Sequence, residues 1–111
     1  MGEAPKPLDG IKVLDLSRVF AGPVCGRILS DLGADVVKVE PPEGDVTRLW
    51  GRKAAGLSTY YVQQNVGKQN ISIDLRKDGG PDLVRQLVEH ADIVIENFRP
   101  GRMEAWGLGP D

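Results

Sequence analysis

The densest group of ligand-binding side chains lies in one short segment, 96–102, near the end of the 111-residue chain. This segment holds an amide at Asn97, an aromatic ring at Phe98 and guanidinium groups at Arg99 and Arg102. Arginine binds phosphate through paired hydrogen bonds, and its flat guanidinium stacks on a purine. The segment therefore predicts a nucleotide site, although both arginines could equally be surface groups that flank a turn.

A second candidate loop lies earlier, where Gly22 and Pro23 follow a short apolar run. Gly22 leaves room for a ligand to pass, and a helix that begins near Pro23 would present free N–H groups to an anion. Both residues could instead only shape a tight turn. Gly22 and Gly26 are spaced G-x-x-x-G rather than G-x-G-x-x-G, which argues against NAD. Glu40 is then either a ribose-binding acid or a solvated carboxylate at a strand end.

The elements that position these loops alternate between strand and helix patterns. Apolar and β-branched runs predict strands over 11–16, 35–40, 70–75 and 93–95. Apolar residues at helical spacing predict helices that begin near Pro23 and Pro81, and residues 59–65 predict a helical turn. Residues 41–58 show no period and predict an irregular surface loop. Strand–helix–strand units form parallel sheets, so we expect an α/β fold with a Rossmann-like parallel sheet and flanking helices, in one domain over 1–111.

Composition narrows the range of partners. Apolar residues make up 41% of the chain and charged residues 27%, as in globular proteins. The net charge of −2 argues against nucleic acid as a partner. No run approaches the ~18 apolar residues of a membrane span, and residues 1–7 lack the apolar stretch of a signal peptide, so no membrane contact is expected. Cys25, the single cysteine, is expected to be buried, forms no metal-ligand pattern and indicates the cytoplasm, with an organellar matrix as the alternative.

Five motifs follow one another along almost the whole chain. They are PLDGIKVLD at 7–15, AGP at 21–23, LGADVVKVE at 32–40, GDVTR at 44–48 with Asn65 and Lys68, and ENFRPG at 96–101. Together they resemble the N-terminal portion of the class III CoA-transferase family, of the formyl-CoA transferase, carnitine dehydratase and bile-acid-inducible type. The resemblance implies the N-terminal, CoA-binding part of a fold in which two ring-shaped chains interlock as a homodimer.

The same resemblance implies a CoA site built from the first loop, the exit of the third strand and the Asn97 loop. Pro41 stands where one branch of the family has an arginine, so Arg48 or Arg102 is expected to supply that contact. Phe20 stands where oxalate-linked members have glutamine and cannot donate a hydrogen bond, which argues against oxalate as the acceptor. The predicted CoA-binding residues are Phe20, Ala21, Ile73, Asp74, Leu75, Arg76, Asn97, Phe98, Arg99 and Arg102.

The implied chemistry is covalent catalysis by an aspartate, which takes CoA from an acyl-CoA as an aspartyl thioester and passes it to a small carboxylic acid. In the family pattern that aspartate lies beyond residue 111. This segment is therefore expected to supply the CoA-binding half, with no catalytic residue, metal site or permanently bound cofactor of its own. An acyl-CoA racemase or isomerase of the same family and a non-catalytic CoA-binding module remain alternatives.

Overall fold

A four-stranded parallel sheet forms the centre of the computed structural model, which describes residues 4–111. Residues 1–3, part of the leading segment 1–7 discussed above, lie outside this range. The elements are β1 (Lys12–Asp15), α1 (Ala21–Asp31), β2 (Asp35–Glu40), the 3-10 helix η1 (Val46–Leu49), β3 (Lys53–Ala54), β4 (Leu57–Ser58), α2 (Thr59–Asn65), β5 (Gln69–Ser72), α3 (Gly80–Val88), β6 (Ile93–Ile95) and α4 (Arg102–Ala105).

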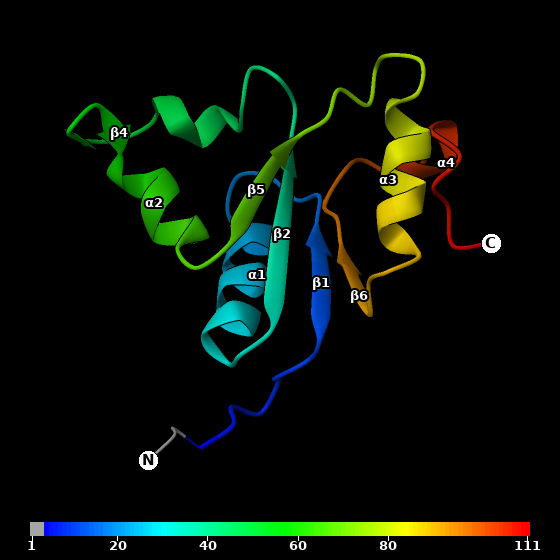
Figure 1. The fold of residues 1–111 in the computed structure, drawn as a ribbon. Coiled ribbons are helices and arrows are strands. Elements are labelled where there is room, and N and C mark those ends of the chain that lie inside the picture. The colour runs from blue at the N-terminus through cyan, green and yellow to red at the C-terminus, as the bar shows by residue number, and fades with distance from the viewer. Residues whose placement is uncertain (1–3) are drawn as a thin grey trace.

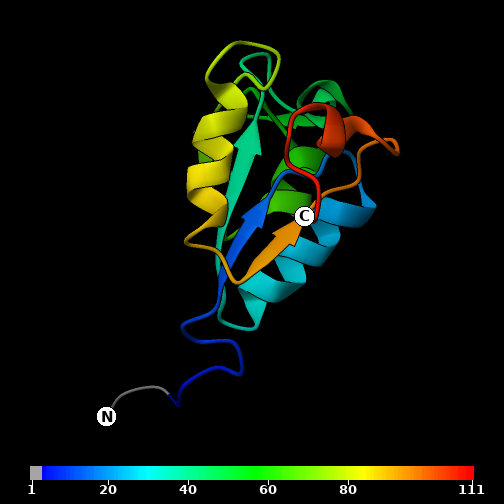
Figure 2. The same cartoon turned by 90° about the vertical axis from the view of Figure 1, so that its right-hand side faces the viewer.

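The order of the strands in the sheet is β5-β2-β1-β6. The chain builds outward from β1 through β2 to β5, and then α3 carries it back so that β6 pairs with the other side of β1. In Figures 1 and 2 α1 covers one face of the sheet and α3 covers the other. This is the strand order of a Rossmann half, and the predicted α/β fold with a Rossmann-like parallel sheet is confirmed. Ligands of such sheets bind where the order reverses, which here is between the exits of β1 and β6.

Each face of the sheet has its own core, as alternation along β1 requires. Leu14 and Leu16 point toward α3 and pack in one cluster with Val84 of that helix. Val13 points the other way and packs with Val36 beneath α1. Because both faces of β1 are covered, its exit is a fixed point from which the first loop starts.

Three expectations drawn from the sequence need correction. The strand predicted over 70–75 ends at Ser72, and Ile73 and Leu75 leave it to pack in the core on the α3 side. The segment 41–58 is not wholly irregular, because it contains η1 and the β3–β4 hairpin, whose two-residue strands are too short to show a period. Cys25 is exposed rather than buried.

Within residues 4–111, none of the helices is long and apolar enough to cross a membrane.

Candidate functional site

Two loops meet at the carboxyl edge of the sheet through one side chain. β1 and β6 run parallel and adjacent, so the chain leaves both strands at the same edge. The Asn97 side chain accepts a hydrogen bond from the Arg18 N–H at 2.9 Å and donates one to the Arg18 carbonyl oxygen at 2.7 Å. The predicted proximity of the first loop and the Asn97 loop is confirmed.

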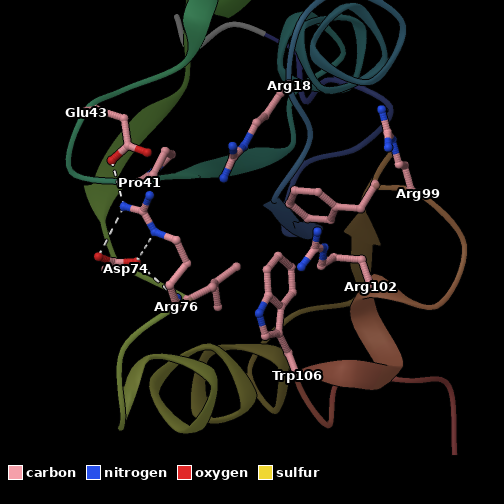
Figure 3. A pocket seen from close by; sticks show the side chains of 10 residues that line it. Arg18, Pro41, Glu43, Asp74, Arg76, Arg99, Arg102 and Trp106 are labelled. Carbon is pink, nitrogen blue, oxygen red and sulfur yellow. Dashed lines mark hydrogen bonds and ion pairs between the residues drawn. The ribbon is translucent and has the colours of Figure 1, made fainter.

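A cavity of about 290 Å³ opens at this edge (Figure 3). It lies where the sheet order reverses, the position at which Rossmann-like sheets bind their ligands. Its lining combines four arginines, two carboxylates, two aromatic rings and two apolar side chains. The lining residues are Arg18, Arg76, Arg99, Arg102, Glu43, Asp74, Phe98, Trp106, Pro41 and Leu75.

Two guanidinium groups and two aromatic rings contact one another along one wall of this cavity. The Arg18 guanidinium carbon lies 5.4 Å from the centre of the Phe98 ring, and that of Arg102 lies 5.6 Å from the Trp106 ring. Phe98 and Trp106 meet edge to face, with 5.1 Å between ring centres. We call these four residues the arginine–aromatic row. In Figure 3 Arg18 and Arg102 point into the cavity, whereas the Arg99 guanidinium points away from both. The row offers positive charge for phosphates and flat surfaces for a base.

The opposite wall holds an arginine that is already paired. Arg76 donates to both oxygens of Asp74, at 2.8 and 3.2 Å, and to Glu43 at 2.9 Å. The hydrogen bonds from Arg76 lower the pKa of Asp74, and those to Asp74 and Glu43 raise the pKa of Arg76. The local charge of Arg76 is therefore largely compensated, unlike that of the arginine–aromatic row.

The structure places the ten predicted CoA-binding residues in two groups. Ile73 is buried in the core, Phe20 and Ala21 are exposed at the start of α1, and both polar ends of the Asn97 amide are used by Arg18. None of these four lines the cavity. The six that do are Asp74, Leu75, Arg76, Phe98, Arg99 and Arg102.

Four of the lining residues were not predicted from the sequence as ligand contacts: Arg18, Pro41, Glu43 and Trp106. Arg18 carries a usable signal, since it follows a buried strand directly and strand exits are where ligands bind. Trp106 carries no such signal, because nothing in the local sequence indicates that α4 folds back against Phe98.

Gly22 serves packing rather than ligand passage. It is buried inside α1, and a methyl group at its position would lie 2.2 Å from the Ser17 Cβ atom. The helix can therefore approach the exit of β1 only with glycine at this position.

Glu40 is neither solvated nor free to bind a ribose. It is 3% exposed and accepts both a 2.8 Å and a 2.7 Å hydrogen bond from Arg48. Tyr61 and Asn70 donate to the same carboxylate, and the Asp45 N–H donates at 2.7 Å. Arg48 also stacks on Tyr61 at 3.9 Å and does not line the cavity of the arginine–aromatic row. Of the two residues predicted as alternatives for this nucleotide contact, only Arg102 lines that cavity.

The Glu40 cluster predicts a specific loss of stability in acid. Burial alone would raise the pKa of Glu40, but the hydrogen bonds from Arg48, Tyr61, the Asp45 amide and Asn70 outweigh it and lower the pKa from 4.5 to about 2. Because the folded-state pKa is the lower one, the stabilisation is complete above pH 4.5 and is lost as the pH falls toward 2. Its size is at most about 3 kcal/mol.

Chemical denaturation of the full chain at pH 6 and pH 3 measures this effect. Glu40→Gln removes the titrating group, so we expect the variant to lose less stability than the wild type between the two pH values. Exposed Glu89 lies outside the cluster, and Glu89→Gln should retain the wild-type dependence. Equal acid losses in the wild type and Glu40→Gln would contradict this account.

Two buried ion pairs fix the loops around the β1 exit. Lys38 donates to Asp45 at 3.2 Å, and Lys68 donates to Asp15 at 2.7 Å, with all four side chains at most 1% exposed. Burial would raise the pKa of Asp45, but the Thr47 amide and the charge of Lys38 lower it. Burial lowers the pKa of Lys68, and the Asp15 carboxylate opposes that shift. The first pair ties the start of η1 to β2, and the second ties the chain after α2 to the end of β1.

The described part of the chain, 4–111, contains no group of three or more His, Cys, Asp or Glu side chains that could hold a metal ion.

Comparison with known proteins gives a consistent result. The sequence profile described as CoA-transferase family III matches residues 8–111. The chain is 50% identical over 107 residues to the succinyl-CoA–D-citramalate CoA-transferase of Chloroflexus aurantiacus, an alignment that covers 95% of this chain and 27% of that protein. It is 45% identical over 106 residues to the human succinyl-CoA:glutarate CoA-transferase, covering 94% of this chain and 24% of the relative.

A solved structure agrees with the sequence relatives. The crystal structure of a CAIB/BAIF family protein from Brucella suis superposes with a TM-score of 0.88 at 49% identity, covering 96% of this chain and 29% of that one. The chain thus spans 24–29% of the length of these relatives. The profile match, the sequence identity and the shared fold together establish that the chain belongs to CoA-transferase family III.

Proposed function

We propose that residues 1–111 form the CoA-binding part of a CoA-transferase that moves CoA between an acyl-CoA and a small carboxylic acid. The observation that carries this proposal is the arginine–aromatic row at the point where the sheet order reverses. The relatives are named as CoA-transferases, which supports transfer over racemisation and over a non-catalytic module.

The chemistry of CoA matches the lining of the cavity. CoA carries a diphosphate, a 3′-phosphate and an adenine, so it needs several cations and a flat apolar surface in one place. Arg102 and Arg99 line the cavity and would bind phosphate oxygens, Arg99 after its side chain turns inward. The Phe98 and Trp106 rings provide a surface on which adenine can stack. We propose CoA and acyl-CoA as substrates rather than as a resident cofactor.

For the complete protein we propose an aspartyl-CoA intermediate. An aspartate carboxylate outside this segment would attack the thioester carbonyl and release the CoA thiolate, which leaves a mixed anhydride. The thiolate would then attack the aspartyl carbonyl, form the aspartyl thioester and release the first acid as a carboxylate. The acceptor carboxylate would repeat these two steps in reverse and leave with CoA, so the aspartate is regenerated.

Two further proposals concern the assembly and its location. Large apolar side chains are exposed on several elements, including Leu49 at 75%, Leu57 at 55% and Phe20 at 53%. Exposed apolar groups of this kind support a homodimer in which another chain or segment covers them. A cytoplasmic location is likewise a proposal, supported by the absence of a second cysteine for an intrachain disulfide.

Calorimetric titration of the full chain with CoA tests the proposed site. Arg102→Ala and Arg99→Ala should each weaken binding by about 1–3 kcal/mol, the range for losing a hydrogen bond to a charged group. Arg52→Ala is the matched control, since Arg52 is exposed and directly precedes the β3–β4 hairpin, which Figure 1 shows on the other side of the molecule from α4. Wild-type affinity in both cavity variants would exclude this cavity as the CoA site.

A further inference from the structure

We infer that Arg18 binds a phosphate group of the nucleotide, and that Asn97 positions Arg18 without touching the ligand. This inference rests on the proposed function. It extends that function to a residue at the exit of β1 that the sequence did not single out as a ligand contact.

The main chain of Arg18 is held from both sides. Its N–H and its carbonyl oxygen are both bonded to the Asn97 side chain, at 2.9 and 2.7 Å. Val19, the next residue, donates its N–H to the buried Asp45 carboxylate at 3.3 Å. Arg18 therefore projects from a fixed point, so little conformational freedom remains to be lost when a ligand binds.

The side chain of Arg18 lacks the partners that a structural arginine normally has. Its Nε atom is buried without a hydrogen-bond acceptor, and no carboxylate within residues 4–111 forms an ion pair with it. The guanidinium lies over Phe98 and points into the cavity in Figure 3. A buried donor without an acceptor is costly, and an anion in the cavity would supply one.

Arg76 shows what a structural arginine looks like in the same cavity. Its guanidinium is bonded to Asp74 and Glu43, and its side chain is 62% exposed. Arg18 differs in both respects, because its charge is uncompensated and its Nε atom is buried. This contrast favours Arg18 as a ligand contact.

The two polar atoms of the Asn97 side chain each hold a hydrogen bond to Arg18 rather than lining the cavity. Its Oδ1 and Nδ2 atoms are both engaged by the Arg18 main chain, and Asn97 is not among the lining residues. Asn97 should therefore affect ligand binding only by holding the main chain of Arg18 in position. This reassigns a residue that the family resemblance predicted to contact CoA directly.

Titrations of the full chain with CoA, pantetheine and inorganic pyrophosphate test both assignments. Arg18→Gln should weaken CoA and pyrophosphate by about tenfold or more, the effect of losing a charged hydrogen bond, and leave pantetheine unchanged. Asn97→Ala should weaken the same two ligands, and the double variant should bind no worse than Arg18→Gln alone, because both act through one group. Arg52→Gln is the control and should match the wild type, and circular dichroism would verify that each variant is folded.

The outcomes separate this inference from the proposed function. Wild-type CoA affinity in Arg18→Gln would overturn the inference and leave the proposed function intact. The same holds if Arg18→Gln weakens the binding of pantetheine as much as it weakens the binding of CoA. Additive losses in the double variant would overturn the positioning role of Asn97. If the wild-type chain failed to bind CoA, the proposed function would be wrong. Pyrophosphate binding that depends on Arg18 would in that case still support an anion site at Arg18, and a lack of pyrophosphate binding would overturn that site.

Discussion

Replacing Lys68 with methionine is expected to lower the free energy of unfolding by about 3–5 kcal/mol, the cost of removing one partner from a buried ion pair. The Lys68 ammonium donates to Asp15 at 2.7 Å, to the Asn65 side chain at 2.8 Å and to the Pro23 carbonyl oxygen at 2.9 Å. Without it the Asp15 carboxylate, which is 0% exposed, keeps hydrogen bonds only from the Ser17 amide and hydroxyl. Chemical denaturation of the full chain measures the loss.

Two comparisons assign this loss to the ion pair. Lys77 is exposed and forms no ion pair within residues 4–111, so Lys77→Met should cost less than about 0.5 kcal/mol, as for ordinary surface substitutions. Asp15→Asn combined with Lys68→Met should cost less than the sum of the single substitutions, since no unpaired charge is left buried. A Lys68→Met loss below about 1 kcal/mol would contradict the role assigned to this pair.

The second large effect is expected from adding one methyl group, in Gly80→Ala. Helix propensity alone favours alanine over glycine by about 1 kcal/mol, so a substitution in α3 could be expected to stabilise the chain. A Cβ atom at this position would lie 2.1 Å from the Asp74 carbonyl oxygen and 3.2 Å from the Leu75 Cα atom. Both neighbours are main-chain atoms and cannot rotate away, so we expect a net loss of about 3 kcal/mol, the upper range for overpacking.

Gly80→Ala should also disturb the candidate site, because the clashing residues Asp74 and Leu75 line the cavity. CoA affinity should fall along with stability. Gly79→Ala is the matched control: its Cβ would meet no atom within 4 Å, and its φ of 87° costs an alanine only about 1–2 kcal/mol. If Gly80→Ala proved no more costly than Gly79→Ala, the close approach of α3 to the exit of β5 would be wrong.

The sequence predicts the central strands well because their side chains are buried. The run from Val36 to Val39 shows its β-branched character plainly, and β2 has the predicted bounds. The edge strand β5 is exposed along its length, and its end was predicted three residues late because Ile73 and Leu75 continue the apolar alternation after the hydrogen-bonded ladder has ended. Apolar alternation indicates which side chains are buried, not which residues are paired in the sheet. Ile73 and Leu75 stay buried after the chain has left β5.

The burial of charged side chains could not be predicted from the sequence for a related physical reason. Glu40, Lys38 and Asp15 are buried beside partners that lie elsewhere in the chain. Their burial depends on Arg48, Asp45 and Lys68, which the fold brings to them. Pairing of this kind follows from tertiary structure and cannot be seen in local composition.

The candidate site was predicted in part, because the residue types of the segment 96–102 indicate a nucleotide site. The remainder required the strand order. Only when β6 pairs with β1 does Arg18 come beside Phe98, and only when α4 folds back does Trp106 complete the wall. Phe20 and Ala21 were predicted from their position in a motif, and they lie at the start of α1, outside the cavity.

A crystal structure of the full protein with CoA is the measurement that tests the central claim most directly. We predict that the adenine lies against Phe98 or Trp106 and that phosphate oxygens lie within hydrogen-bond distance of Arg18 or Arg102, beyond the exits of β1 and β6. A nucleotide bound elsewhere, with the arginine–aromatic row open to solvent, would contradict the account.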